Sequence, residues 1–368
     1  MAAVPPALCL RQRVASGGVC GVKWFTAQGT RHMGKRRMNY FRMNLKTLSL
    51  VAVIMCISCG NYSRKMDTSD KTAGRTTEET APMHHMENDK HINNPSKQYT
   101  MRWFAGEALH ETKGVALVIH GLNLRPDKMG SIIARLTDAG VEALNLSLRG
   151  HGENFSHADI RDSHKARLES FKSVSYQLWL QETRAAYQVA KKRSAQLEVP
   201  LFLVGFSLGG LMGTDLLVAD PGVQFDRMVL FAPALKLHWK SNLIRVLSPF
   251  PGLTIPSFTA ASYQTNDGTP MAGYNALFES LKSVEANLGP KANIPTLVFI
   301  DKKDEMVSFS RLKNMVVEQK LDRWQFYIVQ KESSKGPAKI HHLIIDEAST
   351  GEDVWREMME AMVIHLYD

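Results

Sequence analysis

The hydrophobic pattern from about Tyr99 onward alternates short apolar runs with longer amphipathic stretches. Runs without polar alternation are typical of strands buried on both faces, as in a parallel sheet. The predicted strands span Val115 to Ile119, Val141 to Leu146, Leu201 to Val204, Arg227 to Phe231, Thr296 to Ile300 and Trp324 to Val329.

The amphipathic stretches between these runs predict helices. They span Lys128 to Ala139, Phe171 to Ser194, Leu208 to Val218, Ser310 to Lys320 and Asp353 to Leu366. The resulting order is β-α-β-α-β-α-β, an interruption, and then β-α-β-α. This order predicts an α/β fold with a mostly parallel central sheet flanked by helices.

The interruption covers about residues 233–294 and is rich in proline and apolar residues. We expect an inserted lid here, because a long connection inside a compact domain is usually functional. Its apolar and proline positions are Pro249, Phe250, Pro251, Leu253, Ile255, Pro256 and Phe258.

The N-terminal region has the features of a leader. The apolar run Leu48–Ser58 is too short to span a bilayer and fits a signal-peptide core, with Lys46 just before it. Met43 would be an ordinary start for such a peptide, in which case residues 1–42 are not translated. The run ends in Cys56-Ile-Ser-Cys59-Gly60, which resembles the lipobox of bacterial lipoproteins, although Cys56 stands where that family usually has leucine.

This resemblance implies lipidation at Cys59, membrane attachment through the lipid, and a place in the cell envelope. Two alternatives stay open for residues 1–60: an uncleaved N-terminal anchor, and an organelle presequence. Residues 61–98 are polar and lack a hydrophobic period, so we expect a disordered tether before a domain at 99–368. The histidines of the tether lack the spaced partner ligands of a metal site and are expected to be solvated: His84, His85 and His91.

Charge and cysteine both separate the leader from the rest of the chain. Residues 1–60 hold nine basic and no acidic residues, which account for the whole formal charge of +9, because 36 basic and 36 acidic residues follow Gly60. The basic character therefore gives no reason to expect nucleic-acid binding by the domain. All four cysteines precede Gly60, and this excludes a disulfide framework in the domain.

The strongest chemical motif is Gly205-Phe-Ser207-Leu-Gly209, which follows a predicted strand and opens a predicted helix. In this context G-x-S-x-G predicts a nucleophile elbow, where glycines relieve the crowding of a sharp strand-to-helix turn. The turn would present the Ser207 hydroxyl at a helix N-terminus, whose dipole favours a developing anion.

A serine hydroxyl is a weak nucleophile until an imidazole accepts its proton, and that imidazole needs a carboxylate to orient it. Downstream of Ser207 the chain offers Asp301-Lys-Lys-Asp304-Glu-Met-Val307 after one predicted strand, and Lys339-Ile-His341-His342-Leu-Ile-Ile-Asp346 after the next. Upstream, His120-Gly-Leu122 and Arg149-Gly-His-Gly152 each follow a predicted strand.

Together these motifs resemble α/β-hydrolases of the monoacylglycerol lipase and carboxylesterase type, from about Tyr99 to Leu366. The resemblance implies a triad of Ser207, Asp304 and His341, in the chain order of that superfamily. It further implies an oxyanion hole formed by the backbone amides of Leu122 and Leu208. The Arg149–Gly152 turn is expected to brace the active-site loops.

Two positions of the triad have alternatives. Asp301 is a weaker alternative to Asp304. His342 competes with His341, which is preferred because an acid, Asp346, lies five positions beyond it.

The resemblance implies hydrolysis of acyl esters without a metal or organic cofactor. An apolar lid favours medium or long acyl chains, such as those of monoacylglycerols, because each buried methylene gains about 0.8 kcal/mol. The alternatives are a thioesterase or peptidase on the same fold, and a lipid-binding lipoprotein without turnover.

Overall fold

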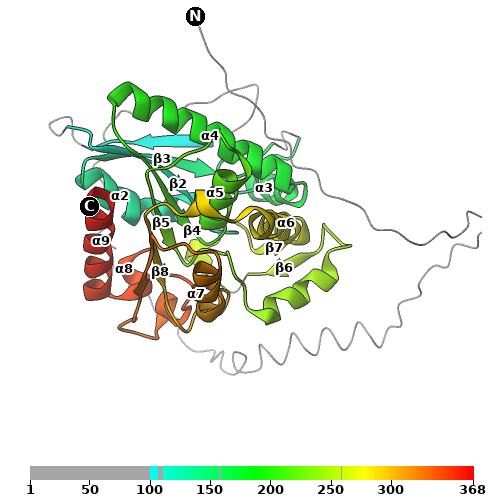
Figure 1. The fold of residues 1–368 in the computed structure, drawn as a ribbon. Coiled ribbons are helices and arrows are strands. Elements are labelled where there is room, and N and C mark those ends of the chain that lie inside the picture. Colours follow the sequence, from blue (N-terminus) through cyan, green and yellow to red (C-terminus); the bar gives the residue numbers. More distant parts are fainter. Residues whose placement is uncertain (1–99, 107–110, 157–158, 258) are drawn as a thin grey trace, which may run out of the picture. The chain divides into compact units, whose positions relative to one another are not determined.

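The central sheet of the computed structural model has seven strands in the order β1-β3-β2-β4-β5-β8-β9 (Figure 1). The structure describes residues 100–368 except 107–110, 157–158 and 258. The strands are β1 (Thr100–Phe104), β2 (Gly114–Ile119), β3 (Val141–Ser147), β4 (Leu201–Phe206), β5 (Arg227–Phe231), β8 (Thr296–Ile300) and β9 (Trp324–Ile328).

Every neighbouring pair in this sheet is parallel except β1 with β3. All six predicted strands are therefore confirmed, along with the mostly parallel arrangement. Residues of β2, β3, β4 and β8 are buried along their whole length, which explains their continuous apolar sequences. The antiparallel edge strand β1 was not predicted from the sequence.

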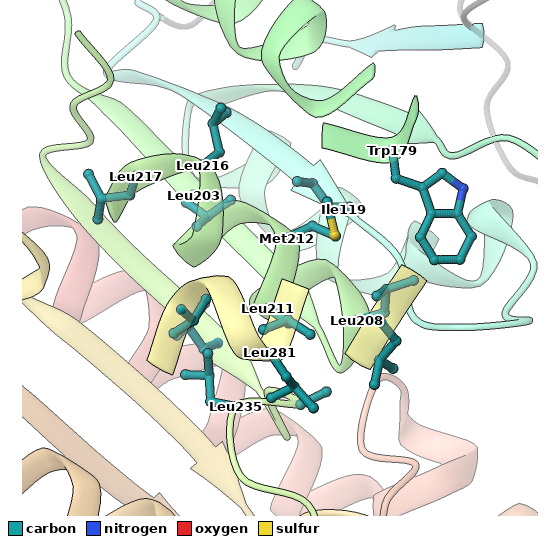
Figure 2. Close-up of a cluster of buried hydrophobic side chains, with 14 of the residues drawn as sticks. Ile119, Trp179, Leu203, Leu208, Leu211, Met212, Leu216, Leu217, Leu235 and Leu281 are labelled. Carbon is teal, nitrogen blue, oxygen red and sulfur yellow. The ribbon is translucent and has the colours of Figure 1, made fainter. Parts of the chain in front are cut away.

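Helices cover both faces of the sheet. One core cluster joins the sheet to α3, α4, α5, α6 and α7, and a second joins it to α2 and α9. In the first cluster, Figure 2 shows Leu203 of β4 beside Met212 and Leu216 of α5. The helices are α2 (Gly130–Asp138), α3 (Ser163–Lys172), α4 (Tyr176–Leu197), α5 (Leu208–Ala219), α6 (Met271–Asn287), α7 (Phe309–Glu318), α8 (Glu347–Thr350) and α9 (Glu352–Tyr367).

The helix predicted from Phe171 to Ser194 is in fact two helices. Phe171 belongs to the end of α3, and α4 begins after Ser175. The Ser175 hydroxyl accepts a hydrogen bond from the Leu178 amide at 3.2 Å, which satisfies an N-terminal donor of α4. This serine cap starts a new helix, so the apolar period does not continue unbroken across it.

The interval from residue 233 to 294 contains more regular structure than a lid alone. It holds the 3-10 helix η2 (Trp239–Leu247), a two-stranded hairpin of β6 (Thr254–Pro256) and β7 (Gly268–Pro270), and α6. Helix α6 packs on α5, where the Ser280 and Ser283 hydroxyls donate to the buried Asp215 carboxylate at 2.7 and 2.6 Å. The C-terminal part of the interval is thus a core helix, and a lid function remains a prediction for residues 239–270.

Several expectations concern residues outside the described ranges. They are the leader with its lipidation site Cys59, the tether at 61–98, and Phe258 of the lid. Among the helices that the structure does describe, none combines the length and the apolar character needed to cross a bilayer.

Candidate active site

Ser207 lies at the tight turn between β4 and α5, with a backbone φ of 50°. Such a left-handed conformation is uncommon for a residue with a side chain and marks local strain. A Cβ atom on Gly205 would lie 2.5 Å from the Gly210 nitrogen, and one on Gly209 would lie 2.0 Å from the Ile119 carbonyl oxygen. The glycines on either side of the serine are therefore sterically required, as the motif predicts.

The imidazole that reaches Ser207 is that of His342. His342 Nε2 lies 2.8 Å from Ser207 Oγ, and His342 Nδ1 lies 2.8 Å from Asp304 Oδ2. An ionised carboxylate can only accept, so Nδ1 carries the proton donated to Asp304 and Nε2 accepts from the serine hydroxyl. The three side chains thus form a continuous hydrogen-bonded chain.

This geometry corrects the choice of His341. His341 Nδ1 instead lies 2.6 Å from Asp301 Oδ2, and its side chain is 25% exposed against 14% for His342. Asp301 and Asp304 lie three residues apart on one loop, so each of two consecutive histidines finds its own carboxylate.

The His342 ring also packs on the ring of Phe206, the last residue of β4, with centroids 5.2 Å apart. The spacing to Asp346, on which the choice of His341 rested, carries no information about these contacts.

Asp304 is the carboxylate nearest the reacting groups, and its side chain is completely buried. Its Oδ1 accepts two backbone hydrogen bonds, from the amides of Met306 and Val307, both at 2.7 Å. These bonds fix the carboxylate and leave Oδ2 for His342. The structure therefore brings together Ser207 and Asp304, as predicted, with the neighbour of the predicted histidine.

The histidine loop is held by two further charged side chains that the sequence reading missed. The Glu305 carboxylate accepts from the amides of His341 and His342, each at 3.0 Å. Lys331 Nζ donates to the carbonyls of Ile340 and Leu343 at 2.7 and 2.6 Å. Burial lowers the pKa of Lys331 to about 8, against the opposing effect of nearby carboxylates.

The loop after β2 lies against the turn that carries Ser207. A Cβ on Gly121 would lie 2.7 Å from the Phe206 ring and 3.4 Å from the Ser207 Cβ. Leu122 follows in this loop, and Leu208 is the first residue of α5, where backbone amides are unpaired within the helix. Neither amide donates a hydrogen bond to any other described residue. Both remain available to an oxyanion, and their role in an oxyanion hole stays a prediction.

Solved structures and a family model match this architecture. The model described as serine aminopeptidase, S33, matches residues 110–272, which is less than half of the chain. A soluble variant of monoglyceride lipase from Saccharomyces cerevisiae, in complex with a substrate analogue, superposes with a TM-score of 0.62 at 11% identity over 78% of this chain and 96% of that one. The monoacylglycerol lipase of Paleococcus ferrophilus gives a TM-score of 0.52 at 19% identity over 73% and 99% of the two chains.

A structure of the metagenome-derived lipolytic enzymes LipS and LipT gives a TM-score of 0.54 at 16% identity, over 72% of this chain and 96% of that one. This chain has the α/β-hydrolase fold. A search of curated protein sequences finds no significant match. This fold explains why residues far apart in the sequence meet at the site. Each of them follows the carboxyl end of a strand in one largely parallel sheet: Leu122, Ser207, Asp304 and His342.

Within this fold, two buried histidines brace the loops around Ser207. His120 Nε2 accepts from the Leu148 amide at 3.1 Å, and His151 Nε2 accepts from the Asn123 amide at 2.9 Å. Burial lowers the pKa of His120 to about 4 and that of His151 well below its usual range. Both rings are therefore neutral near pH 7, and the bracing predicted for the Arg149–Gly152 turn is confirmed for His151.

The segment from Tyr263 to Asn266 is a second brace, which sequence reasoning did not find. Asn123 and Asn266 share three hydrogen bonds. Asn123 Nδ2 donates to the Asn266 carbonyl at 2.8 Å, and Asn123 Oδ1 accepts from Asn266 N at 3.0 Å and from Asn266 Nδ2 at 3.3 Å. Tyr263 donates from its hydroxyl to Asp346 Oδ2 at 2.7 Å, just beyond the histidine loop. One insertion segment thus contacts both the Leu122 loop and the histidine loop.

Proposed function

We propose that this protein is a serine hydrolase that cleaves carboxylic esters. The observation that carries the proposal is the pair of 2.8 Å contacts that link Ser207 Oγ to His342 Nε2 and His342 Nδ1 to Asp304 Oδ2. This arrangement provides a nucleophile, a general base within proton-transfer distance, and a carboxylate that orients the base.

In the acylation step, Ser207 Oγ attacks the acyl carbonyl carbon while its proton passes to His342 Nε2. Asp304 stabilises the resulting imidazolium through Nδ1–H. The carbonyl oxygen becomes an anion, for which the amides of Leu122 and Leu208 are the proposed donors. Removing one such donor typically costs about 10²- to 10³-fold in rate.

Collapse of the tetrahedral intermediate breaks the bond to the leaving oxygen, and His342 returns its proton to the departing alcohol. A water molecule then attacks the acyl-enzyme, with His342 again taking a proton. The carboxylic acid leaves and Ser207 Oγ recovers its hydrogen. No metal or organic cofactor has a part in this scheme.

For the substrate, we propose esters of medium or long acyl chains, including monoacylglycerols. Two structural neighbours carry monoglyceride or monoacylglycerol lipase as their names, and the segment from Pro233 to Asn266 contains no acidic residue and many apolar ones. Phe250 and Leu253 are 53% and 45% exposed, so these two apolar residues of the expected lid do not line a closed acyl slot. Rates on p-nitrophenyl esters from acetate to laurate should rise with chain length. A maximum at acetate would exclude this substrate class.

A peptidase is the second candidate, favoured by the description of the matching family model. An aminopeptidase must pair the ammonium group of its substrate with a carboxylate. The carboxylates beside the site are already engaged, Asp301 by His341 and Glu305 by two backbone amides. We therefore expect hydrolysis of p-nitrophenyl esters and not of aminoacyl p-nitroanilides. The reverse preference would establish the peptidase, and turnover of acyl thioesters alone would establish a thioesterase.

For the location, we propose a lipoprotein of the cell envelope, with the hydrolase domain tethered to a membrane through lipidated Cys59. The support is the apolar run before Cys59 and the lipobox-like sequence around it. Intact-mass measurement on protein from the membrane fraction should show chain cleavage before Cys59 and a diacylglyceryl addition. An unmodified Cys59 within a longer chain would instead favour an uncleaved anchor or a presequence.

A further inference from the structure

The exposed apolar side chains of the described residues are concentrated in one segment. Five of the eight large ones lie between Trp239 and Leu253. We call them the outer patch: Trp239 (65% exposed), Leu243 (49%), Val246 (63%), Phe250 (53%) and Leu253 (45%). A cluster of this kind marks an interaction surface more often than a random feature of a monomer.

Helix η2 separates two apolar faces. Ile244 and Leu247 pack against the core, whereas Leu243 and Val246 point to solvent. Residues three apart align along a 3-10 helix, so each pair forms its own stripe. Figure 1 shows this yellow-green segment at the margin of the fold, on the side away from α9. The inner stripe therefore holds the helix in place while the outer stripe has no partner among the described residues.

The residues just before the outer patch are hydrogen-bonded to the loop that holds Asp304. The His238 amide donates to the Met306 carbonyl at 2.9 Å, and the Ser308 amide donates to the Lys236 carbonyl at 2.8 Å. His238 Nε2 lies 3.0 Å from the Asp304 carbonyl oxygen. Trp239 directly follows this paired segment, so the patch begins beside the candidate active site.

The charge of the segment favours an anionic partner. No acidic residue occurs from Pro233 to Asn266, and Lys240 and Arg245 are exposed. Lys236 is paired with Glu285 at 2.7 Å, and the Arg245 guanidinium lies 4.5 Å from the centre of the Phe278 ring. Symmetric docking of two copies through this patch would bring Lys240 and Arg245 close to their own equivalents. Like-charge repulsion disfavours that arrangement.

We propose that the outer patch docks on a bilayer that contains anionic phospholipid. The apolar side chains enter the boundary between headgroups and acyl chains, and Lys240 and Arg245 lie at the phosphates. This binding does not require turnover. It holds the loop that carries Asp304 close to the membrane, where acyl esters are found.

The test uses the full chain with vesicles of phosphatidylcholine and phosphatidylglycerol whose acyl chains are brominated. Bromine quenches indole fluorescence only inside the bilayer. The vesicles should quench part of the tryptophan emission, and that part should be missing in Trp239→Phe. Equal quenching in the two proteins would overturn the proposal, even if the vesicles bind through another region.

Matched variants then separate the apolar and the charged contributions. Val246→Ser should raise the lipid concentration for half-maximal Trp239 quenching at least tenfold, whereas Val317→Ser, an equally exposed valine on α7, should leave it unchanged. Lys240→Gln and Arg245→Gln should each raise it about fivefold on anionic vesicles. Lys313→Gln is the charge control. Equal effects of patch and control variants would contradict the proposal.

Two further measurements distinguish this surface from its alternatives. Ser207→Ala should keep the Trp239 quenching while losing ester hydrolysis, so failure of the proposed catalysis leaves the docking result intact. Val246→Ser should keep wild-type rates on a water-soluble short ester. If sedimentation velocity without lipid showed an oligomer that Val246→Ser dissociates, the patch would be an interface between copies and the membrane proposal would be wrong.

Discussion

His341 forms a hydrogen bond with Asp301 at 2.6 Å, directly beside the equivalent contact of His342 with Asp304 at 2.8 Å. Two parallel histidine–aspartate pairs thus connect the same two loops. Only the second pair reaches Ser207. The first pair fixes the position of the loop, so the two histidines should differ sharply in what their removal costs.

We predict that His342→Ala lowers kcat for ester hydrolysis by at least about 10³-fold, because general-base catalysis is lost. His341→Ala should lower kcat by about tenfold or less, since the remaining contacts still hold the loop. Steady-state kinetics on one p-nitrophenyl ester compare the two. A larger loss for His341→Ala would restore the sequence-based choice.

A second prediction concerns the lysine that holds the histidine loop. Lys331→Met removes both hydrogen bonds to the carbonyls of Ile340 and Leu343 and should lower kcat about 10- to 100-fold with little change in KM, because small displacements of a base are costly. Lys335→Met, at an exposed position of the same loop, is the control. Partial recovery in Lys331→Arg would support positioning, whereas a change in KM alone would argue against it.

A third prediction follows from the neutral state of His120. Its folded pKa of about 4 lies below the ordinary histidine pKa of 6.5 in the unfolded chain, so the unfolded state binds the proton first as the pH falls. The stability contribution is complete above pH 6.5 and is lost between pH 6.5 and 4, reaching about 2 kcal/mol of loss at pH 5.

Urea unfolding at pH 7 and pH 5 tests this assignment. His120→Gln retains an acceptor for the Leu148 amide but cannot titrate, so the difference between the two pH values should shrink by about 2 kcal/mol. His164→Gln, at an exposed position, should leave the difference as in the wild type. The same pH dependence in all three proteins would show that His120 is not its source.

A fourth prediction tests the steric role of the elbow glycines. Gly209→Ala would place a Cβ 2.0 Å from the Ile119 carbonyl oxygen, at the carboxyl end of β2, and should destabilise the protein by about 3 kcal/mol or more. A Cβ on Gly252 would meet no atom within 4 Å, so Gly252→Ala should change stability by less than about 0.5 kcal/mol. Thermal unfolding of the two variants measures the contrast, and similar melting temperatures would refute it.

The sequence predicted those features that depend on local pattern. Continuous apolar runs identified the six parallel strands, and the glycine spacing around Ser207 identified the turn, because both reflect steric demands within a few residues. The edge strand Thr100–Phe104 mixes polar and apolar residues and follows a polar stretch, and it was missed. Helix α6 was missed because the proline-rich residues before it led us to interpret the whole interval as a lid.

The correct histidine and the braces could not be read from the sequence, because they depend on contacts between distant segments. The adjacent His341 and His342 each satisfy a carboxylate, and only the approach of the loop to β4 decides which ring meets Ser207. Similarly, Asn123 and Asn266 lie 143 residues apart, and nothing local to either indicates their pairing.

The most direct test of the account is reaction with a fluorophosphonate, followed by peptide mass spectrometry. We predict one adduct on Ser207 in the wild type and in His341→Ala, and none on that residue in His342→Ala within the same reaction time. Lack of any Ser207 adduct in folded wild-type protein would contradict the proposed hydrolase and favour a lipid-binding protein without turnover.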